Sequence, residues 1–141
     1  MLVAAVFVVA GINGCSSGVG AAGPGPGQLA PGTAQLTLDG GNTVKSEAVQ
    51  CLPNEHLMLI TIGEEPPIAV AMVSNTEDLA VKWVRFHDAG GFSGSYNDGL
   101  GGKANATLAG STYQITGVAE GFGEQEAARP TTQAFAVEVA C

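Results

Sequence analysis

Two histidine–carboxylate neighbours, Glu55-His56 and His87-Asp88, carry the side chains that could act as general bases. A hydrolytic triad also needs a serine or cysteine nucleophile held against such a histidine. No Gly-x-Ser-x-Gly turn, which presents the nucleophile in one large class of hydrolases, accompanies either pair. We therefore expect both histidines to face solvent at strand ends, and we predict that the protein is not an enzyme.

Ligands for metal ions are equally sparse in the sequence. A calcium loop alternates oxygen ligands along one segment, and Asn97-Asp98-Gly99 is too short to form one. Two histidines and three widely separated cysteines do not make a transition-metal set. The sequence therefore predicts no metal site and no cofactor that binds without a covalent bond.

Cys15 has the most informative surroundings of any residue. It follows the apolar stretch 1–12 and stands directly after the small residue Gly14. Such a stretch, ending in a small residue, is typical of a secretory signal. The cysteine at its end is similar to a bacterial lipobox, in which the thiol takes diacylglycerol, cleavage makes the cysteine residue one, and an N-acyl chain is added. We predict lipidation of Cys15.

Two features of this signal need comment. No Lys or Arg precedes Cys15, so the basic region of a signal peptide is missing. We expect either that the natural start codon lies upstream or that the first residues of the chain are missing from this sequence. The stretch 1–12 would rise only about 18 Å as a helix, short of the roughly 30 Å hydrocarbon core, so we do not expect it to span a membrane.

The charge balance limits the partners of the chain. Five Lys and Arg face thirteen Asp and Glu, for a formal net charge of −8, and no basic run is interleaved with aromatic residues. Such a chain repels phosphate backbones, which argues against nucleic-acid binding. It also disfavours electrostatic adhesion to anionic lipid, so we expect membrane attachment to come through the acyl chains on Cys15.

Cys51 and Cys141 remain once Cys15 is assigned to the lipid. An even pair in an oxidising compartment favours a disulfide, although two buried free thiols are the alternative. The alternating pattern places Cys141 on the face of Phe135, Val137 and Val139, and Cys51 on the face of Val49. We therefore expect a buried bridge that ties the C-terminus to an early strand.

From Thr33 onward, turn signals alternate with short runs rich in Val, Ile, Thr and aromatic residues. This spacing predicts an all-β fold, an antiparallel β-sandwich or half-open barrel. The expected strands are 34–38, 46–52, 56–62, 67–73, 80–87, 92–97, 103–108, 111–119 and 133–140. One helical turn is expected within 123–129, and Leu57–Ile62, apolar on both faces, is expected to be a central strand or to be covered on both sides.

The domain organisation follows from these boundaries. We predict a signal peptide at 1–14, the acylated cysteine and a Gly/Pro-rich flexible tether at 15–32, and a β-rich domain at 33–141. A tether of this composition reaches roughly 20–25 Å. Met58, Met72 and Trp83 could line an apolar groove for a lipid within the domain, with ordinary core packing as the alternative.

The folded part resembles the mycobacterial 19 kDa lipoprotein antigen family, the LpqH-type lipoproteins. The resemblance rests on Leu38-Asp39-Gly40, Val49-Gln50-Cys51, Ile60-Thr61-Ile62-Gly63, the segment 113–121 and the ending 135–141. It implies an acylated antigen without enzymatic activity, exposed at the actinobacterial surface and recognised by host lipopeptide receptors. It also implies a Cys51–Cys141 disulfide and attachment to the extracytoplasmic face of the cell membrane.

One departure and two alternatives accompany this resemblance. Members of the family often carry a Thr-rich tether that receives mannose, whereas this tether offers only Ser16, Ser17 and Thr33. A lipid or glycolipid carrier of the cell envelope is the first alternative, and it requires an unfilled apolar cavity. A periplasmic inhibitor that acts through a loop such as 88–102 is the second.

Overall fold

The computed structural model describes residues 25, 27–41, 43–76, 78–124 and 128–141. These residues form ten β-strands and no helix, in one antiparallel sheet. The strands are β1 (Ala34–Leu38), β2 (Thr43–Ser46), β3 (Val49–Asn54), β4 (Leu57–Ile62), β5 (Ala69–Ser74), β6 (Ala80–Ala89), β7 (Phe92–Asn97), β8 (Ala104–Ala109), β9 (Thr112–Phe122) and β10 (Thr131–Ala140). The all-β fold class is confirmed.

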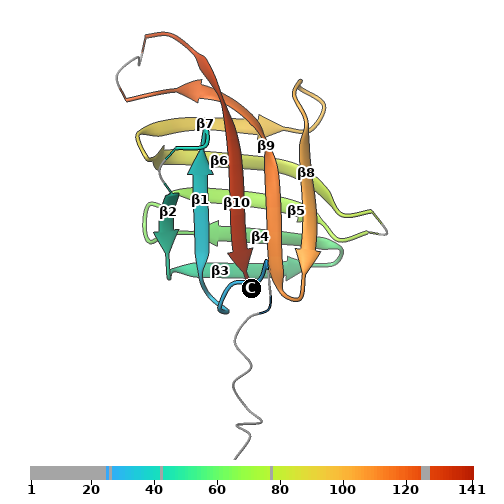
Figure 1. The fold of residues 1–141 in the computed structure, drawn as a ribbon. Helices are drawn as coiled ribbons and strands as arrows, with labels where there is room; N and C mark the ends of the chain where they lie inside the picture. Colours follow the sequence, from blue (N-terminus) through green and yellow to red (C-terminus); the bar gives the residue numbers. More distant parts are fainter. Residues whose placement is uncertain (1–24, 26, 42, 77, 125–127) are drawn as a thin grey trace, which may run out of the picture.

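The sheet curls over itself into an almost closed barrel with two layers (Figure 1). Its order is β2-β1-β10-β9-β7-β6-β5-β4-β3, and β8 pairs with the free side of β9. In Figure 1, β2, β1, β10, β9 and β8 run upright in the front layer, while β7 to β3 cross behind them. The expectation of a sandwich or half-open barrel is therefore confirmed.

The long strand β9 carries the sheet from one layer to the other. Its first half pairs with β8, and its last residues pair with β7. At this crossing Gly94 and Gly121 are partners in register. A Cβ on Gly121 would fall on the carbonyl of Ser93, and one on Gly94 would fall on the carbonyl of Glu120. Only glycine lets the two backbones approach so closely.

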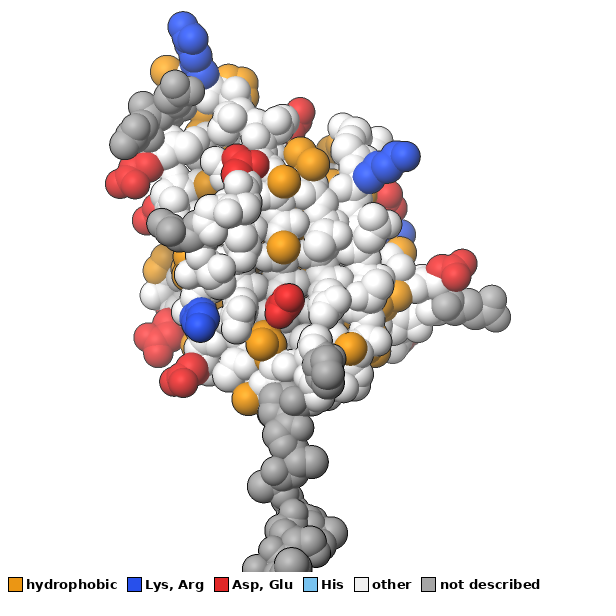
Figure 2. All heavy atoms as spheres, in the orientation of Figure 1, with side chains coloured by type: hydrophobic (Ala, Val, Ile, Leu, Met, Phe, Trp, Pro, Cys, Tyr) orange, Lys and Arg blue, Asp and Glu red, His pale blue; other side chains and the backbone are white. Residues whose placement is uncertain are grey.

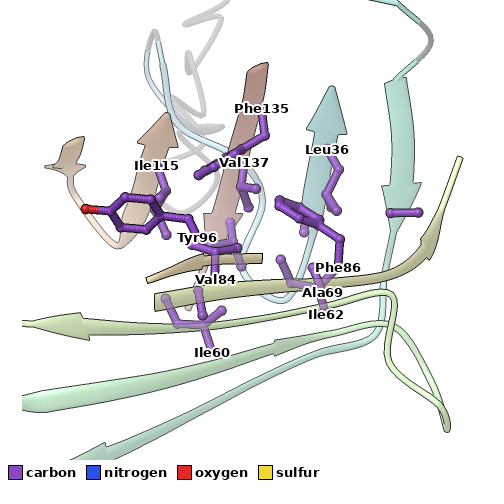
Figure 3. Close-up of a cluster of buried hydrophobic side chains, with 14 of the residues drawn as sticks. Leu36, Ile60, Ile62, Ala69, Val84, Phe86, Tyr96, Ile115, Phe135 and Val137 are labelled. Atoms are coloured by element: carbon purple, nitrogen blue, oxygen red, sulfur yellow. The ribbon is translucent and has the colours of Figure 1, made fainter. Parts of the chain in front are cut away.

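The core fills the space between the two layers. Figure 3 shows Leu36, Ile115 and Val137 of the front layer pointing toward Ile60 and Val84 of the back layer. These inward side chains are almost fully buried, and each contributes about 1.5–3 kcal/mol through burial. The aromatic contacts centre on one ring: Phe86 lies 6.2 Å from Phe92 and 5.2 Å from Phe135 between ring centroids.

The expected strand 46–52 corresponds to β3 but begins too early, and the short strand β2, which ends at Ser46, was not predicted. The chain turns at residues 47 and 48, where the backbone N–H of Ala48 donates to Ser46 Oγ at 3.1 Å. The hydroxyl of Ser46 thus stabilises a turn that contains no Gly or Pro and therefore lacks the usual sequence signal. Of the helical turn expected within 123–129, residues 125–127 lie outside the described residues, and the described ones are not helical.

The disulfide is present, but its predicted burial is wrong. Cys51 and Cys141 are bonded, with their Cα atoms 5.8 Å apart and a sequence separation of 90. Cys51 does pack against the core from its inward face, yet it is partly exposed, and Cys141 is exposed. Since β3 is an edge strand and Cys141 follows the end of β10, solvent reaches the bridge from outside the barrel.

Candidate functional site

Cys15, the predicted lipidation site, lies outside the described residues together with the signal segment 1–14. The structure instead shows how the segment after it is attached. Gln114 Nε2 donates to the carbonyl of Gly27 at 3.1 Å, and the backbone N–H of Leu29 donates to Thr112 Oγ1 at 3.0 Å. From Gly27 onward, the last part of the predicted tether therefore hydrogen-bonds to the domain.

The disulfide lies at this same end of the molecule. The backbone N–H of Gly32 donates to the carbonyl of Ala140 at 2.9 Å, and that of Cys141 donates to the carbonyl of Ser111 at 3.0 Å. Thr112, which receives the Leu29 hydrogen bond, is buried. The attachment point of the N-terminal segment, the C-terminus and the β3 edge are thus joined by hydrogen bonds and one covalent bridge.

The structure brings together two of the three residues predicted to line an apolar groove. Met72 of β5 and Trp83 of β6 are partners in register on the outer face of the back layer. Met58 is the partner of the buried Val73 and packs against the core from the inner face. Because successive residues of a strand point to opposite faces, Met58 does not join the other two.

Sequence reasoning missed two leucines that extend the Met72–Trp83 pair. Leu52 of β3 pairs with Leu59 of β4, and Leu59 pairs with Met72. The four side chains form one row across β3, β4, β5 and β6, which we call the outer row. The apolar character of Leu57–Ile62 on both faces was the signal, but the partners of Leu59 depend on strand register.

The interior offers no support for the lipid-carrier alternative in the described part of the chain. The space between the layers is occupied by packed side chains such as Ile60, Val84 and Val139, which are fully buried. A lipid carrier would need an unfilled apolar cavity, and these side chains fill the space in which such a cavity would lie.

Neither histidine is placed for nucleophilic chemistry. His56 and His87 are both exposed. The hydroxyl oxygen of Ser93 accepts a hydrogen bond from the backbone N–H of Asp88 at 2.8 Å, so it serves a turn. Within the part of the chain that the structure describes, no three His, Cys, Asp or Glu side chains gather closely enough to hold a metal ion.

One open hollow of about 410 Å³ lies beside the β7–β9 crossing. Tyr96, Glu120 and Leu100 are among the residues that line it. Leu100, in the predicted inhibitory loop 88–102, is 81% exposed. This exposure suits a contact with a partner, and the inhibitor alternative stays a prediction. Among the described residues, no helix has the length and apolar character needed to cross a bilayer.

The geometry defines a class of protein: a disulfide-closed β-barrel domain whose N-terminal segment is attached beside the bridge. The Mycobacterium 19 kDa lipoprotein antigen family model matches residues 27–141, beginning at the residue where the hydrogen-bonded part starts. The chain belongs to this family. Family membership implies a membrane-anchored lipoprotein of the cell envelope.

Individual relatives agree with this assignment. Lipoprotein LpqH of Mycobacterium tuberculosis (strain ATCC 25618 / H37Rv) is 30% identical over 157 residues, covering 97% of this chain and 92% of that protein. A putative lipoprotein of Mycobacterium indicus pranii is 29% identical over 110 residues, covering 77% of this chain and 78% of that protein. These names describe lipoproteins, and none of them names an enzymatic activity.

Proposed function

We propose that this protein is acylated at Cys15 and displays its β-domain as a non-enzymatic antigen on the extracytoplasmic side of the cell membrane. The observation that carries the proposal is the small residue and cysteine at the end of an apolar stretch, in a chain that belongs to a lipoprotein antigen family. A diacylglycerol and an N-acyl chain suffice for stable attachment, whereas one acyl chain holds a protein only marginally.

The position of the N-terminal segment supports display of the domain. The contacts of Gly27 and Leu29 hold the end of this segment against β9, so the anchor pulls on the most cross-linked end of the domain. The disulfide at that end prevents the C-terminal strand from separating there. The acylated N-terminus is the part that host lipopeptide receptors would recognise.

The intact mass of protein extracted from the membranes of an actinobacterial host tests the anchor. We expect a mature chain that begins at Cys15, carries the added acyl chains and gains two hydrogens on reduction of the Cys51–Cys141 bridge. The Cys15→Ser variant is the control and should lack the acyl mass. A wild-type chain that keeps residues 1–14 without acylation would refute the proposal.

Receptor recognition needs its own comparison. Reporter cells bearing a lipopeptide receptor should respond to the acylated protein and not to Cys15→Ser at equal concentration. The double variant Cys51→Ala/Cys141→Ala keeps Cys15 and should retain the response, because the signal is assigned to the acyl chains and not to the domain. Equal responses to wild-type protein and Cys15→Ser would refute the receptor part of the proposal.

A further inference from the structure

The outer row crosses the back layer as a continuous apolar band. Leu52, Leu59, Met72 and Trp83 are successive partners in register, so the band spans four strands and about 14 Å at the usual strand spacing. Leu52 is 52% exposed, and the other three side chains are partly exposed. No strand of the described domain covers this face of the sheet.

The outer row and the two rows beside it contain no acidic residue. The paired rows on either side of it are Asn54-Leu57-Ser74-Ala80 and Gln50-Thr61-Val70-Arg85. None of the three rows contains Asp or Glu, although the chain has thirteen. Figure 2 shows that the opposite face, formed by the front layer, carries carboxylates near its middle and at its edge, with scattered hydrophobic side chains.

A cationic side chain lies beside the tryptophan at one end of the row. The guanidinium carbon of Arg85 lies 5.0 Å from the centre of the Trp83 ring. Lys82 precedes Trp83 and pairs with Asp98 at 3.6 Å. An aromatic ring beside a guanidinium suits the boundary between headgroups and acyl chains, where the ring is partly buried and the cation contacts phosphate.

The anchored end of the chain places this face near lipid. Leu52 follows Cys51, which is bonded to Cys141, and Cys141 lies at the end where the Gly27 segment is attached. Gly27 lies twelve positions after Cys15 along the chain. A Gly-rich chain of that length has a root-mean-square span of about 17–21 Å, less than the width of a small domain. The outer row therefore begins within reach of the surface that holds the anchor.

From these observations we infer that the outer row is a membrane-docking surface: Leu52, Leu59, Met72 and Trp83 rest on the phospholipid surface in which Cys15 is anchored. The inference rests on the acylation proposed above, because a net charge of −8 would not bring the free domain to anionic lipid. Once the anchor holds the domain at the membrane, the side chains of the outer row move from water into the headgroup region of the bilayer, and Arg85 faces lipid phosphate.

Trp83 is the only tryptophan of the chain and reports directly on this contact. Full-length acylated protein, verified by intact mass, is reconstituted into vesicles of phosphatidylcholine and phosphatidylglycerol. We expect a blue shift of the emission and a several-fold loss of intensity when the lipid is brominated in the upper part of its acyl chains. Acylated protein that floats with the vesicles while its emission is unchanged would overturn the inference.

Two matched substitutions test the face. Leu52→Glu should abolish the quenching although the protein stays acylated and vesicle-bound. Val118→Glu is the control: Val118 is similarly exposed, at 43%, but lies on β9 in the front layer, so quenching should persist. Leu59→Thr should weaken the quenching. Because threonine is well tolerated in strands, this variant replaces Leu52→Glu if the latter does not fold. An equal loss of quenching in Val118→Glu would contradict the assignment of the outer row as the docking surface.

The remaining outcomes separate this inference from the proposed function. An unacylated mass overturns the proposed function, and the inference falls with it. Acylated protein whose Trp83 is shielded from both brominated lipid and aqueous acrylamide, with cross-linked pairs of chains, would show that a second copy covers the row. That result overturns the inference and leaves the anchor in place.

Discussion

The Cys51–Cys141 bridge makes a large and calculable contribution to stability. It closes a loop with a sequence separation of 90. Chain entropy alone then gives about 4.6 kcal/mol at 25 °C, near the upper end of the usual 2–5 kcal/mol range. Domains of this size are stable by only about 5–15 kcal/mol, so loss of the bridge removes a large fraction of the total.

The perturbation is the double variant Cys51→Ala/Cys141→Ala, which leaves no unpaired thiol in the domain. With a urea dependence of about 2 kcal/mol per molar, the unfolding midpoint should fall by about 2 M. Trp83 fluorescence and far-UV circular dichroism provide two probes, and coincident transitions would justify a two-state treatment.

Reduction of the wild-type protein provides an independent route to the same state. Because Cys141 is exposed and Cys51 is partly exposed, a reductant can reach the bridge in the folded protein. Reduced wild type and the double variant should have the same midpoint, and reductant should not affect the variant. If loss of the bridge lowered the free energy of unfolding by less than about 1 kcal/mol, the loop-closure argument would be refuted. It would mean that the hydrogen bonds at Gly32, Ala140 and Cys141 already hold this end.

Three further substitutions test the packing. Gly121→Ala places a Cβ on the Ser93 carbonyl and should cost about 1–3 kcal/mol in urea unfolding, whereas Gly123→Ala, with no atom nearby, should change little. Phe86→Ala removes the ring that contacts two other aromatic residues and should cost about 3–5 kcal/mol, seen as a lower thermal midpoint. Thr112→Val removes the acceptor of the Leu29 N–H and should cost about 0.5–1.5 kcal/mol, with faster amide exchange at Leu29. Equal costs in the two glycine variants, or unchanged exchange at Leu29, would contradict the respective contact.

Much of the fold could be predicted from local patterns. The alternation of Phe135, Val137 and Val139 placed these residues on the buried face of β10, and the structure confirms it. Such alternation is readable because successive side chains of a strand point to opposite faces. The turn between β2 and β3 escaped prediction because Ser46 makes it with its hydroxyl, a residue type that is also common within strands.

The sequence by itself predicted the pairing of Cys51 with Cys141, which the structure confirms, and it predicts lipidation of Cys15, which stays a prediction. These conclusions depend on residue types and spacing along the chain. The outer row, the exposure of the bridge and the close glycine crossing were decided only by the tertiary structure. Each depends on which residues of distant strands become partners, and that register is set by packing the whole barrel, because local alternation fixes a face but not a neighbour.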